Sequence, residues 1–294
     1  MEKIILDTDI GSDIDDAVCL AYLLKQPKCD LLGITTVSGE PEKRAMMASV
    51  LCKVVGKDGI PIYPGIENPL VTPIVQPKAQ QAKLLDRWAH DKKLPKGEAI
   101  EFLRRTIREN PGEITLLAIG PMTNIAALFI IDPEIPSLLK DLILMCGVFS
   151  YKLHNNIILT EWNALNDPYA TKIVYEAKAK RIRSIGLDVT MKVIMDKQEC
   201  KDSFTADIME PVFDFAGVWF ENADHIVFHD PLAATTIFDD KICRFEKGDI
   251  QVETNSHFLG GLTKFSSSAD GINEVAVDVD SNLFFKHFFD VVGR

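Results

Sequence analysis

Five aspartates lie within ten residues near the start of the chain. They are Asp7, Asp9, Asp13, Asp15 and Asp16, with no Lys or Arg among them. Like charges at this spacing repel one another, so a buried cluster needs a compensating cation. A helix start can use one or two of them, but not Asp7 and Asp9 at the end of a buried strand. The pattern indicates a hard-cation site, and all-oxygen ligands favour calcium or magnesium.

Two known motifs of similar composition do not fit this segment. An EF-hand loop starting at Asp7 would need Asp or Asn at its fifth position and Gly at its sixth, where Gly11 and Ser12 stand. The D-x-D-x-[TV] pattern of aspartyl-phosphate phosphatases has Thr or Val where Gly11 stands. This phosphatase interpretation stays open, because its nucleophilic Asp also follows a first strand and uses a divalent metal. At the helix that follows, Ser12 or Asp13 is the expected cap.

Two further groups of polar residues lie far along the chain. His229 and Asp230 precede Pro231, and by itself Asp230 is explained as the cap of a helix that begins at this proline. Residues 155–156 and 160–163 place a carboxylate and several amides around an aromatic ring. Such groups suit the hydroxyls of a sugar. The chain has no G-x-G-x-x-G, Walker or G-x-S-x-G sequence, so nucleotide-phosphate binding and serine-esterase chemistry lack support.

Short apolar runs that alternate with helical patterns must position these residues. The strands are expected at residues 4–6, 31–37, 59–65, 114–119, 142–145, 183–187, 248–254 and 275–279. The helices are expected at residues 17–24, 42–55, 99–108, from 121 onward, 168–177, 231–238 and 282–292. Residues 71–95 show no period, which predicts a mobile loop.

The order of these elements predicts the fold class. Continuous apolar strands, each followed by a helix, are typical of a parallel sheet covered on both faces. No linker, repeat or low-complexity tract divides the chain. We therefore expect an α/β protein, a single Rossmann-like domain over residues 1–294, with a mostly parallel sheet flanked by helices. Ligands in such sheets bind at the carboxyl ends of the strands, where several of the polar groups lie.

The composition argues against some classes of binding partner and indicates a compartment. The 294 residues include 43 acidic and 32 basic ones, for a formal charge of −11, which argues against binding to nucleic acid or to an anionic membrane. No secretory signal is visible, and no apolar run approaches the roughly 20 residues that span a bilayer. Six scattered cysteines without a C-x-x-C pair indicate core residues in a reducing compartment. We therefore expect a cytoplasmic protein.

Together the motifs resemble those of the inosine-uridine preferring nucleoside hydrolase family, enzymes that cleave the N-glycosidic bond of ribonucleosides. The resemblance covers nearly the whole chain and rests on residues 7–17, 119–124, 161–163 and 229–231, in that order. It implies a calcium ion held by three carboxylates and one backbone carbonyl. On that basis the metal ligands are Asp9, Asp16, Asp230 and, through its carbonyl, Ile119.

The resemblance also implies the substrate site and the reaction. Asp15 matches a carboxylate that contacts the ribose diol, and the other sugar-binding positions are Met145, Asn155, Glu161 and Asn163. A calcium-activated water attacks the sugar. Asp9 is the candidate base for that water. His229 is the candidate to protonate or contact the departing base.

Three departures from the family pattern stand out. The first motif is two residues longer than D-x-D-x-G-x-D-D, by Ser12-Asp13-Ile14. Gly39-Glu40 stands where Gly-Asn is common, which makes Glu40 a candidate ribose contact. Residues 88–91 replace a His-Gly-rich loop. These changes leave the choice between purine and pyrimidine bases open and predict a divergent member of the family.

Three functions therefore compete. The first is a calcium-dependent ribonucleoside hydrolase, which the family suggests is a homodimer or homotetramer and which would serve purine and pyrimidine salvage. The second is a metal-dependent phosphohydrolase with an Asp nucleophile. The third is a protein that binds nucleosides without cleaving them.

Overall fold

Nine strands form one twisted sheet in the computed structural model, which describes residues 1–150, 152–153 and 156–293. The strand order is β12-β11-β13-β8-β5-β4-β1-β2-β3. The pairs from β13 to β3 are all parallel, and β11 is antiparallel to both of its neighbours. These strands are β1 (Glu2–Thr8), β2 (Cys29–Thr36), β3 (Ile62–Pro64), β4 (Ile114–Ala118), β5 (Asp141–Met145), β8 (Ile182–Ile185), β11 (Cys243–Val252), β12 (Thr263–Ser267) and β13 (Asn273–Val279).

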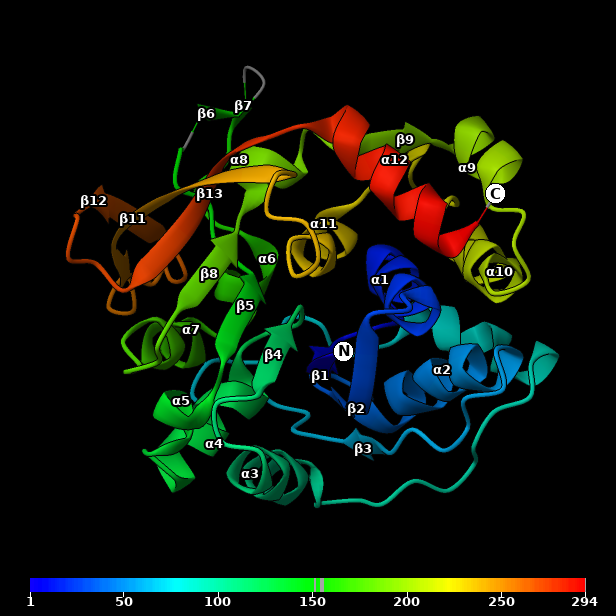
Figure 1. The fold of residues 1–294 in the computed structure, drawn as a ribbon, viewed down its shortest axis with the longest axis horizontal. Helices are drawn as coiled ribbons and strands as arrows, with labels where there is room; N and C mark the ends of the chain where they lie inside the picture. The colour runs from blue at the N-terminus through cyan, green and yellow to red at the C-terminus, as the bar shows by residue number, and fades with distance from the viewer. Residues whose placement is uncertain (151, 154–155, 294) are drawn as a thin grey trace.

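Helices cover both faces of this sheet (Figure 1). They are α1 (Asp15–Lys25), α2 (Pro41–Val54), α3 (Ala99–Glu109), α4 (Thr123–Ile131), α5 (Ile135–Leu138), α6 (Trp162–Asn166), α7 (Pro168–Tyr175), α8 (Leu187–Thr190), α9 (Lys197–Ser203), α10 (Met209–Trp219), α11 (His229–Thr235), α12 (Ser281–Val292) and the 3₁₀ helix η1 (Gln80–Arg87). Two small two-stranded sheets pair β6 (Lys152–Leu153) with β7 (Asn156–Ile157) and β9 (Ile194–Asp196) with β10 (His225–Val227).

The side chains of β1 show why its apolar run is continuous. Ile4 and Leu6 belong to the core under α1, α2, α10, α11 and α12, and Ile5 belongs to the second core under α3, α4, α5 and α7. Successive strand residues point to opposite faces, so a strand that is buried on both faces needs apolar residues at every position. The expected α/β class, with a mostly parallel sheet flanked by helices, is confirmed.

The strand order creates a crevice beside β1. The chain runs from β1 to β2 and β3 on one side of the sheet, then crosses to β4, β5 and β8 on the other side. The connections after β1 and after β4 therefore diverge at the carboxyl ends of two adjacent strands, which is where ligands bind in open α/β sheets. The Asp-rich segment follows β1 at this point.

Several local expectations need correction. Residues 71–95 are not structureless, because η1 forms within them, and both Gln76 and Gln81 are buried there. The helix expected at residues 231–238 begins at His229 and ends at Thr235. It starts early because the carbonyl of Phe228, directly after strand β10, already accepts a helical hydrogen bond from the N–H of Leu232 at 3.2 Å, while the N–H of Phe228 donates to the carbonyl of Val193 at 2.9 Å. The chain therefore passes from strand to helix without a loop.

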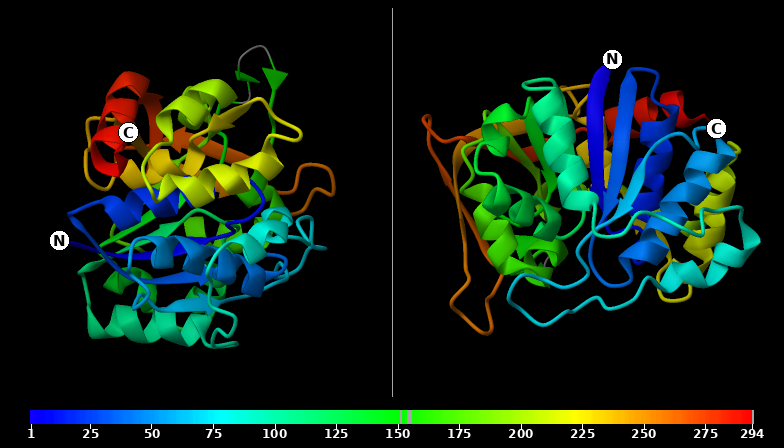
Figure 2. Two further views of the ribbon diagram at one scale, coloured as in Figure 1. Left: turned by 90° about the vertical axis from the view of Figure 1, so that its right-hand side faces the viewer. Right: turned by 90° about the horizontal axis from the view of Figure 1, so that it is seen from below.

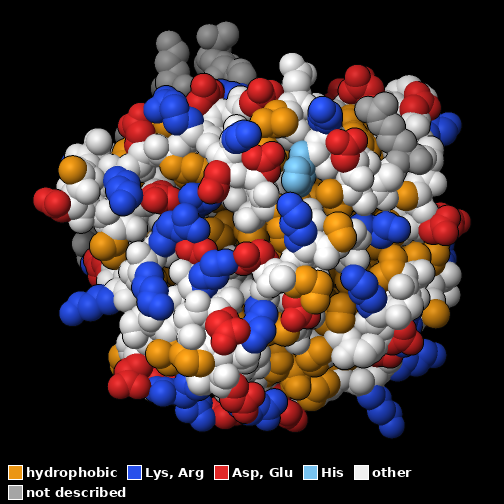
Figure 3. Space-filling view, in the orientation of Figure 1, with side chains coloured by type: hydrophobic (Ala, Val, Ile, Leu, Met, Phe, Trp, Pro, Cys, Tyr) orange, Lys and Arg blue, Asp and Glu red, His pale blue; other side chains and the backbone are white. Residues whose placement is uncertain are grey.

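The β11–β12 connection projects from one side of the molecule in both views of Figure 2. On the face shown in Figure 3, acidic and basic side chains intermingle. Within the described ranges, no helix is both long enough and apolar enough to cross a bilayer. The six cysteines are free and buried. That residues 1–294 form one domain from end to end stays a prediction.

Candidate active site

Two helix starts bring together carboxylates from opposite ends of the chain. Asp15 and Asp16 occupy the first turn of α1, and Asp230 occupies the first turn of α11. The two helices lie side by side (Figure 1). One ligand atom from each of the three carboxylates lies within 4.8 Å of the others, and all three side chains are buried. The backbone N–H of Asp230 also donates to Oδ2 of Asp15 at 3.1 Å.

These helix starts do not use the cap residues expected from the sequence. The N-cap of α1 is Ile14 rather than Ser12 or Asp13, and that of α11 is Phe228 rather than Asp230. Neither cap makes a side-chain hydrogen bond to its helix. The carboxylates in the first turns interact favourably with the helix dipoles, but capping does not account for them. Their free oxygens remain available to a ligand.

The electrostatics of the cluster call for a cation. Burial raises the pKa of Asp15, Asp16 and Asp230 well above the usual range, and repulsion between neighbouring carboxylates raises it further. Burial likewise raises the pKa of Asp9, and it raises that of Asp13 to about 6. A divalent ion with oxygen ligands would remove this penalty. The donor set therefore fits a hard cation such as calcium or magnesium.

Asp9 lies in the same cavity but is not one of the three close carboxylates. Its Oδ2 accepts a hydrogen bond from Nε2 of Gln76 at 2.8 Å. Its backbone carbonyl accepts one from the fully buried Arg44, which also donates to the carbonyls of Ile10 at 3.2 Å and Gly39 at 2.8 Å. Arg44 therefore holds the backbone of the Asp segment, and its positive charge partly offsets the raised pKa of Asp9.

The carboxyl ends of β4 and β5 form the opposite wall. Nδ2 of Asn163 donates to the carbonyl of Ile119 at 2.8 Å and to that of Met145 at 3.0 Å. One side chain thus joins the ends of two adjacent strands. A Cβ at Gly120 would lie only 2.9 Å from both the backbone N and Oδ1 of Asp9. Only glycine at this position allows the β4 end to approach the Asp segment so closely.

Glu161 has a local task in addition to its predicted contact with the sugar. It is the N-cap of α6, and its carboxylate accepts from the backbone N–H groups of Asn163 at 2.6 Å and of Ala164 and Gly147 at 3.0 Å each. Burial raises its pKa, and these three hydrogen bonds favour the ionised form. These three hydrogen bonds therefore fix the orientation of the Glu161 carboxylate toward the cavity.

The half-buried His229 side chain is neutral at physiological pH. Burial lowers the pKa of its imidazole to about 4. Nδ1 lies 2.7 Å from Oγ1 of Thr190, which fixes the ring relative to α8. A neutral imidazole offers one N–H donor, so this side chain is suited to hydrogen bonding with a leaving group rather than to carrying a positive charge.

The cavity between these walls has a volume of about 520 Å³. All four predicted metal ligands line it: Asp9, Asp16, Ile119 and Asp230. Five predicted substrate contacts line it as well: Asp15, Met145, Glu161, Asn163 and His229. A cavity of this size suits a ligand as large as a nucleoside.

Two predicted substrate contacts are not brought into this cavity. Glu40 is not among its lining residues, because its carboxylate binds Nζ of Lys43 at 2.5 Å and the backbone N–H of Ala79 at 3.0 Å. Asn155 lies outside the described residues. The sequence interpretation also missed two residues, Gln76 and Arg44, that touch the Asp segment. Neither belongs to a motif, and the segment around Gln76 shows no period that would have marked it.

Comparison with known proteins agrees with this geometry. Residues 4–286 match the family described as inosine-uridine preferring nucleoside hydrolase. The chain is 28% identical over 291 residues to uridine nucleosidase 1 of Arabidopsis thaliana, which covers 91% of this chain and 84% of that protein. It is 27% identical over 317 residues to the inosine-uridine preferring nucleoside hydrolase of Crithidia fasciculata, which covers 100% of this chain and 98% of that protein.

A solved structure of a plant nucleoside hydrolase superimposes with a TM-score of 0.83 at 26% identity, covering 99% of this chain and 98% of that one. The region that matches this family includes the Asp segment, the carboxyl ends of β4 and β5, and the start of α11. The chain therefore belongs to the inosine-uridine preferring nucleoside hydrolase family, whose members are hydrolases that act on the N-glycosyl bond of nucleosides.

Proposed function

We propose that the chain hydrolyses ribonucleosides to free base and ribose with a calcium ion held by Asp9, Asp16, Asp230 and the carbonyl of Ile119. The observation that carries this proposal is the group of three buried carboxylates at the starts of α1 and α11, beside a cavity that also contains Glu161 and Asn163. Calcium accepts six to eight oxygen ligands in a flexible arrangement, which suits carboxylates that come from separate elements.

The ribose would lie against the carboxylate end of the cavity. When bound, the calcium ion supplies positive charge that polarises a water molecule and attracts the sugar hydroxyls. Asp15 lies beside Asp16 and Asp230, so its carboxylate is placed to accept hydrogen bonds from a vicinal diol. Asn163 and Glu161 are held by strand-end and cap contacts, and they would fix the other side of the sugar.

Asp9 is the proposed base that removes a proton from the attacking water. Cleavage of an N-glycosidic bond by water develops positive charge on the sugar in an oxocarbenium-like transition state. Buried carboxylates close to the sugar stabilise that charge. His229 would donate a hydrogen bond to the departing base from its neutral ring, since burial opposes its protonation.

The test is an assay on a panel of purine and pyrimidine nucleosides, with and without a chelator, that measures reducing sugar and free base. We expect release of both products, loss of activity with the chelator and its return with calcium. The panel will also show whether purine or pyrimidine nucleosides are preferred. Asp9→Ala should abolish both turnover and its metal dependence, and wild-type rates in that variant would contradict its assignment as base and ligand.

Two controls separate the alternatives. Phosphate release from a panel of phosphoesters, without base release from nucleosides, would instead support the phosphohydrolase. Nucleoside binding by calorimetry without any product would support the non-catalytic interpretation. A role in purine and pyrimidine salvage follows only if the first outcome is obtained.

We also propose a cytoplasmic location, which the six free, buried cysteines support. The homodimer or homotetramer expected from the family stays a prediction. Light scattering coupled to size-exclusion chromatography will test it.

A further inference from the structure

A glutamine from the aperiodic segment between β3 and η1 lines the cavity beside the Asp segment. Gln76 is only 4% exposed, although the residues on either side of it, Val75 and Pro77, are exposed. Burial of an unpaired amide is unfavourable, so such a side chain needs hydrogen-bond partners. Gln76 has three of them.

The partners of Gln76 determine how its amide is oriented. Nε2 donates to Oδ2 of Asp9 at 2.8 Å and to Oγ of Ser12 at 2.6 Å. Oε1 accepts from Nε1 of Trp162. An indole N–H can only donate and a carboxylate can only accept, so the amide cannot be reversed without breaking two of these bonds. Gln76 is therefore fixed as a donor to Asp9.

The backbone of Gln76 is also held in place. Its carbonyl accepts from Oγ of Ser38 at 3.4 Å. Gly39 packs so closely beneath it that a Cβ there would lie 2.4 Å from the carbonyl oxygen of Gln76 and 2.4 Å from the carbonyl carbon of Pro77. A residue whose backbone and side chain are both held in place can fix the orientation of a side chain that it hydrogen-bonds.

We propose that Gln76 is a positioning residue that fixes the orientation of the Asp9 carboxylate. This inference rests on the proposed function only in that Asp9 is taken to be a calcium ligand and the base. Among the described hydrogen bonds, the contact with Gln76 is the one that a side chain makes to the carboxylate of Asp9. Without it, no described side chain would donate to Oδ2, and the carboxylate would be free to rotate about its side-chain bonds.

Two substitutions separate this contact from the other contacts of Gln76. Gln76→Met keeps the length of the side chain but has no N–H group. Gln76→Glu keeps an acceptor for Trp162 but has no donor for Asp9. Ser38→Ala is the matched control, because it removes only a long hydrogen bond of 3.4 Å to the backbone of Gln76, which the packing against Gly39 still holds in place, and it leaves the side chain intact.

The measurements are steady-state hydrolysis of inosine and uridine by the calcium-loaded full chain, a calorimetric titration of the metal-free protein with calcium, and thermal unfolding. We expect kcat of both Gln76 variants to fall about 10- to 100-fold, since a hydrogen bond to a charged group is lost. KM should change less than about 3-fold, because the sugar contacts remain. The dissociation constant for calcium should rise about 10-fold, and Ser38→Ala should match the wild type.

Three results would overturn the inference. The first is a rise in KM with unchanged kcat, which would mean that Gln76 binds substrate directly. The second is wild-type behaviour of Gln76→Glu, which would mean that the bond to Trp162 is what matters. The third is an unchanged calcium affinity in both variants. By contrast, a wild-type protein that neither cleaves nucleosides nor binds calcium would contradict the proposed function itself, and that result is obtained before any Gln76 variant is measured.

Discussion

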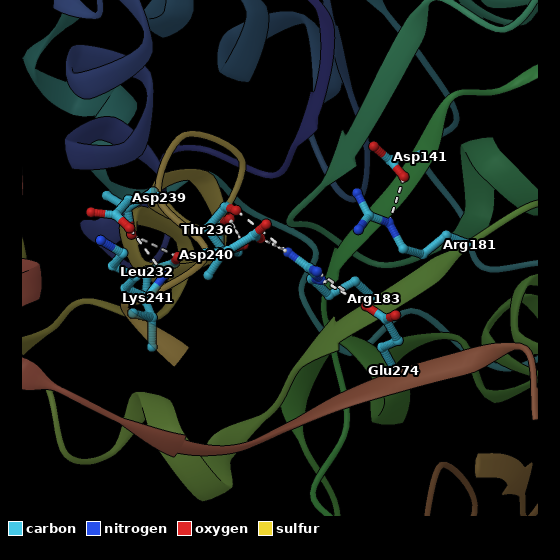
Figure 4. A network of polar contacts seen from close by, with 11 residues as sticks. Asp141, Arg181, Arg183, Leu232, Thr236, Asp239, Asp240, Lys241 and Glu274 are labelled. Carbon is cyan, nitrogen blue, oxygen red and sulfur yellow. Dashed lines mark hydrogen bonds and ion pairs between the residues drawn. The ribbon is translucent and has the colours of Figure 1, made fainter. Parts of the chain in front are cut away.

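Two clusters of charged side chains in this molecule, one around a buried arginine and one of buried carboxylates, are built in opposite ways. Arg183 on β8 is 5% exposed and lies between two acidic partners, with Nη1 2.7 Å from Asp240 and Nη2 3.1 Å from Glu274 (Figure 4). Its guanidinium also lies 4.0 Å from the centre of the Phe245 ring and donates to the carbonyl of Thr236. Every charge in this cluster meets an opposite charge.

The cluster at the starts of α1 and α11 lacks that balance. In the part of the chain that the structure describes, no ion pair joins a Lys or Arg to Asp9, Asp15, Asp16 or Asp230. Arg44 binds backbone carbonyls, and its charge only partly offsets the raised pKa of Asp9 and Asp16. A buried network that only stabilises the fold pairs its charges, because an unpaired buried charge is costly. The difference indicates that this group of carboxylates serves to bind a ligand rather than to stabilise the fold.

The largest expected effect comes from removing one charge from the unbalanced cluster. Asp230→Asn should lower kcat on the order of 100- to 1,000-fold, since a ligand of the cation loses its charge. The same change should raise the free energy of unfolding of the metal-free protein by about 1 kcal/mol, because it relieves repulsion among buried carboxylates. Nucleoside assays and urea unfolding in a chelator measure the two effects. Lower stability of the metal-free variant would contradict the comparison.

Removal of a charge from the cluster around Arg183, the balanced cluster, should instead lower the free energy of unfolding. Arg183→Met should lower the free energy of unfolding by about 3 kcal/mol, because Glu274 is left partly buried without its partner. Turnover per folded molecule should stay within a few-fold of the wild type, since Arg183 does not line the cavity. Urea unfolding and an assay at low temperature test this pair of outcomes. A loss of turnover as large as that of Asp230→Asn would mean that the two clusters are not independent.

Removal of the metal should lower the Tm only of proteins in which the carboxylate cluster at the starts of α1 and α11 is intact. At a calcium concentration about 100 times the dissociation constant, the ion stabilises the protein by about 2.7 kcal/mol. Chelation should therefore lower the Tm of the wild type and of Arg183→Met by a similar amount, and it should leave Asp230→Asn nearly unchanged. Scanning calorimetry with and without calcium measures these shifts. Equal shifts in all three proteins would place the ion elsewhere.

The smallest expected losses of stability come from replacing the two acidic partners of Arg183. The Asp240 side chain is 74% exposed and that of Glu274 is 17% exposed. Glu274→Gln should therefore cost about 1 kcal/mol and Asp240→Asn no more than about 0.5 kcal/mol, because solvent screens the exposed pair. A ranking in the reverse order, measured by urea unfolding, would mean that burial does not set the strength of these pairs.

The central part of the fold could be predicted because its strands are buried on both faces. The apolar runs at 4–6, 114–119 and 142–145 coincide with β1, β4 and β5. The last third was harder to predict. There α10 carries Pro211 near its start, and short elements such as α9 and β9 have too few residues to show a period.

The candidate site could be predicted as far as its residues follow strand ends or belong to motifs. Asp9 follows β1, Ile119 follows β4, and Asp230 belongs to the His-Asp-Pro motif. Gln76 could not be found in this way, because its role depends on tertiary contacts of an aperiodic segment. Glu40 was expected at the sugar, but it begins α2 with a φ of 59° and binds Lys43 and Ala79.

The contact between Asp15 and Asp230 joins residues that are 215 positions apart in the sequence. An ion shared by α1 and α11 would act as a cross-link between the first helix of the protein and its last third. The entropy cost of closing a loop grows with its length, so a link across so long a stretch of chain stabilises the folded state more than one across a short stretch. Limited proteolysis of the metal-depleted protein should then begin in the segments that flank these two helices.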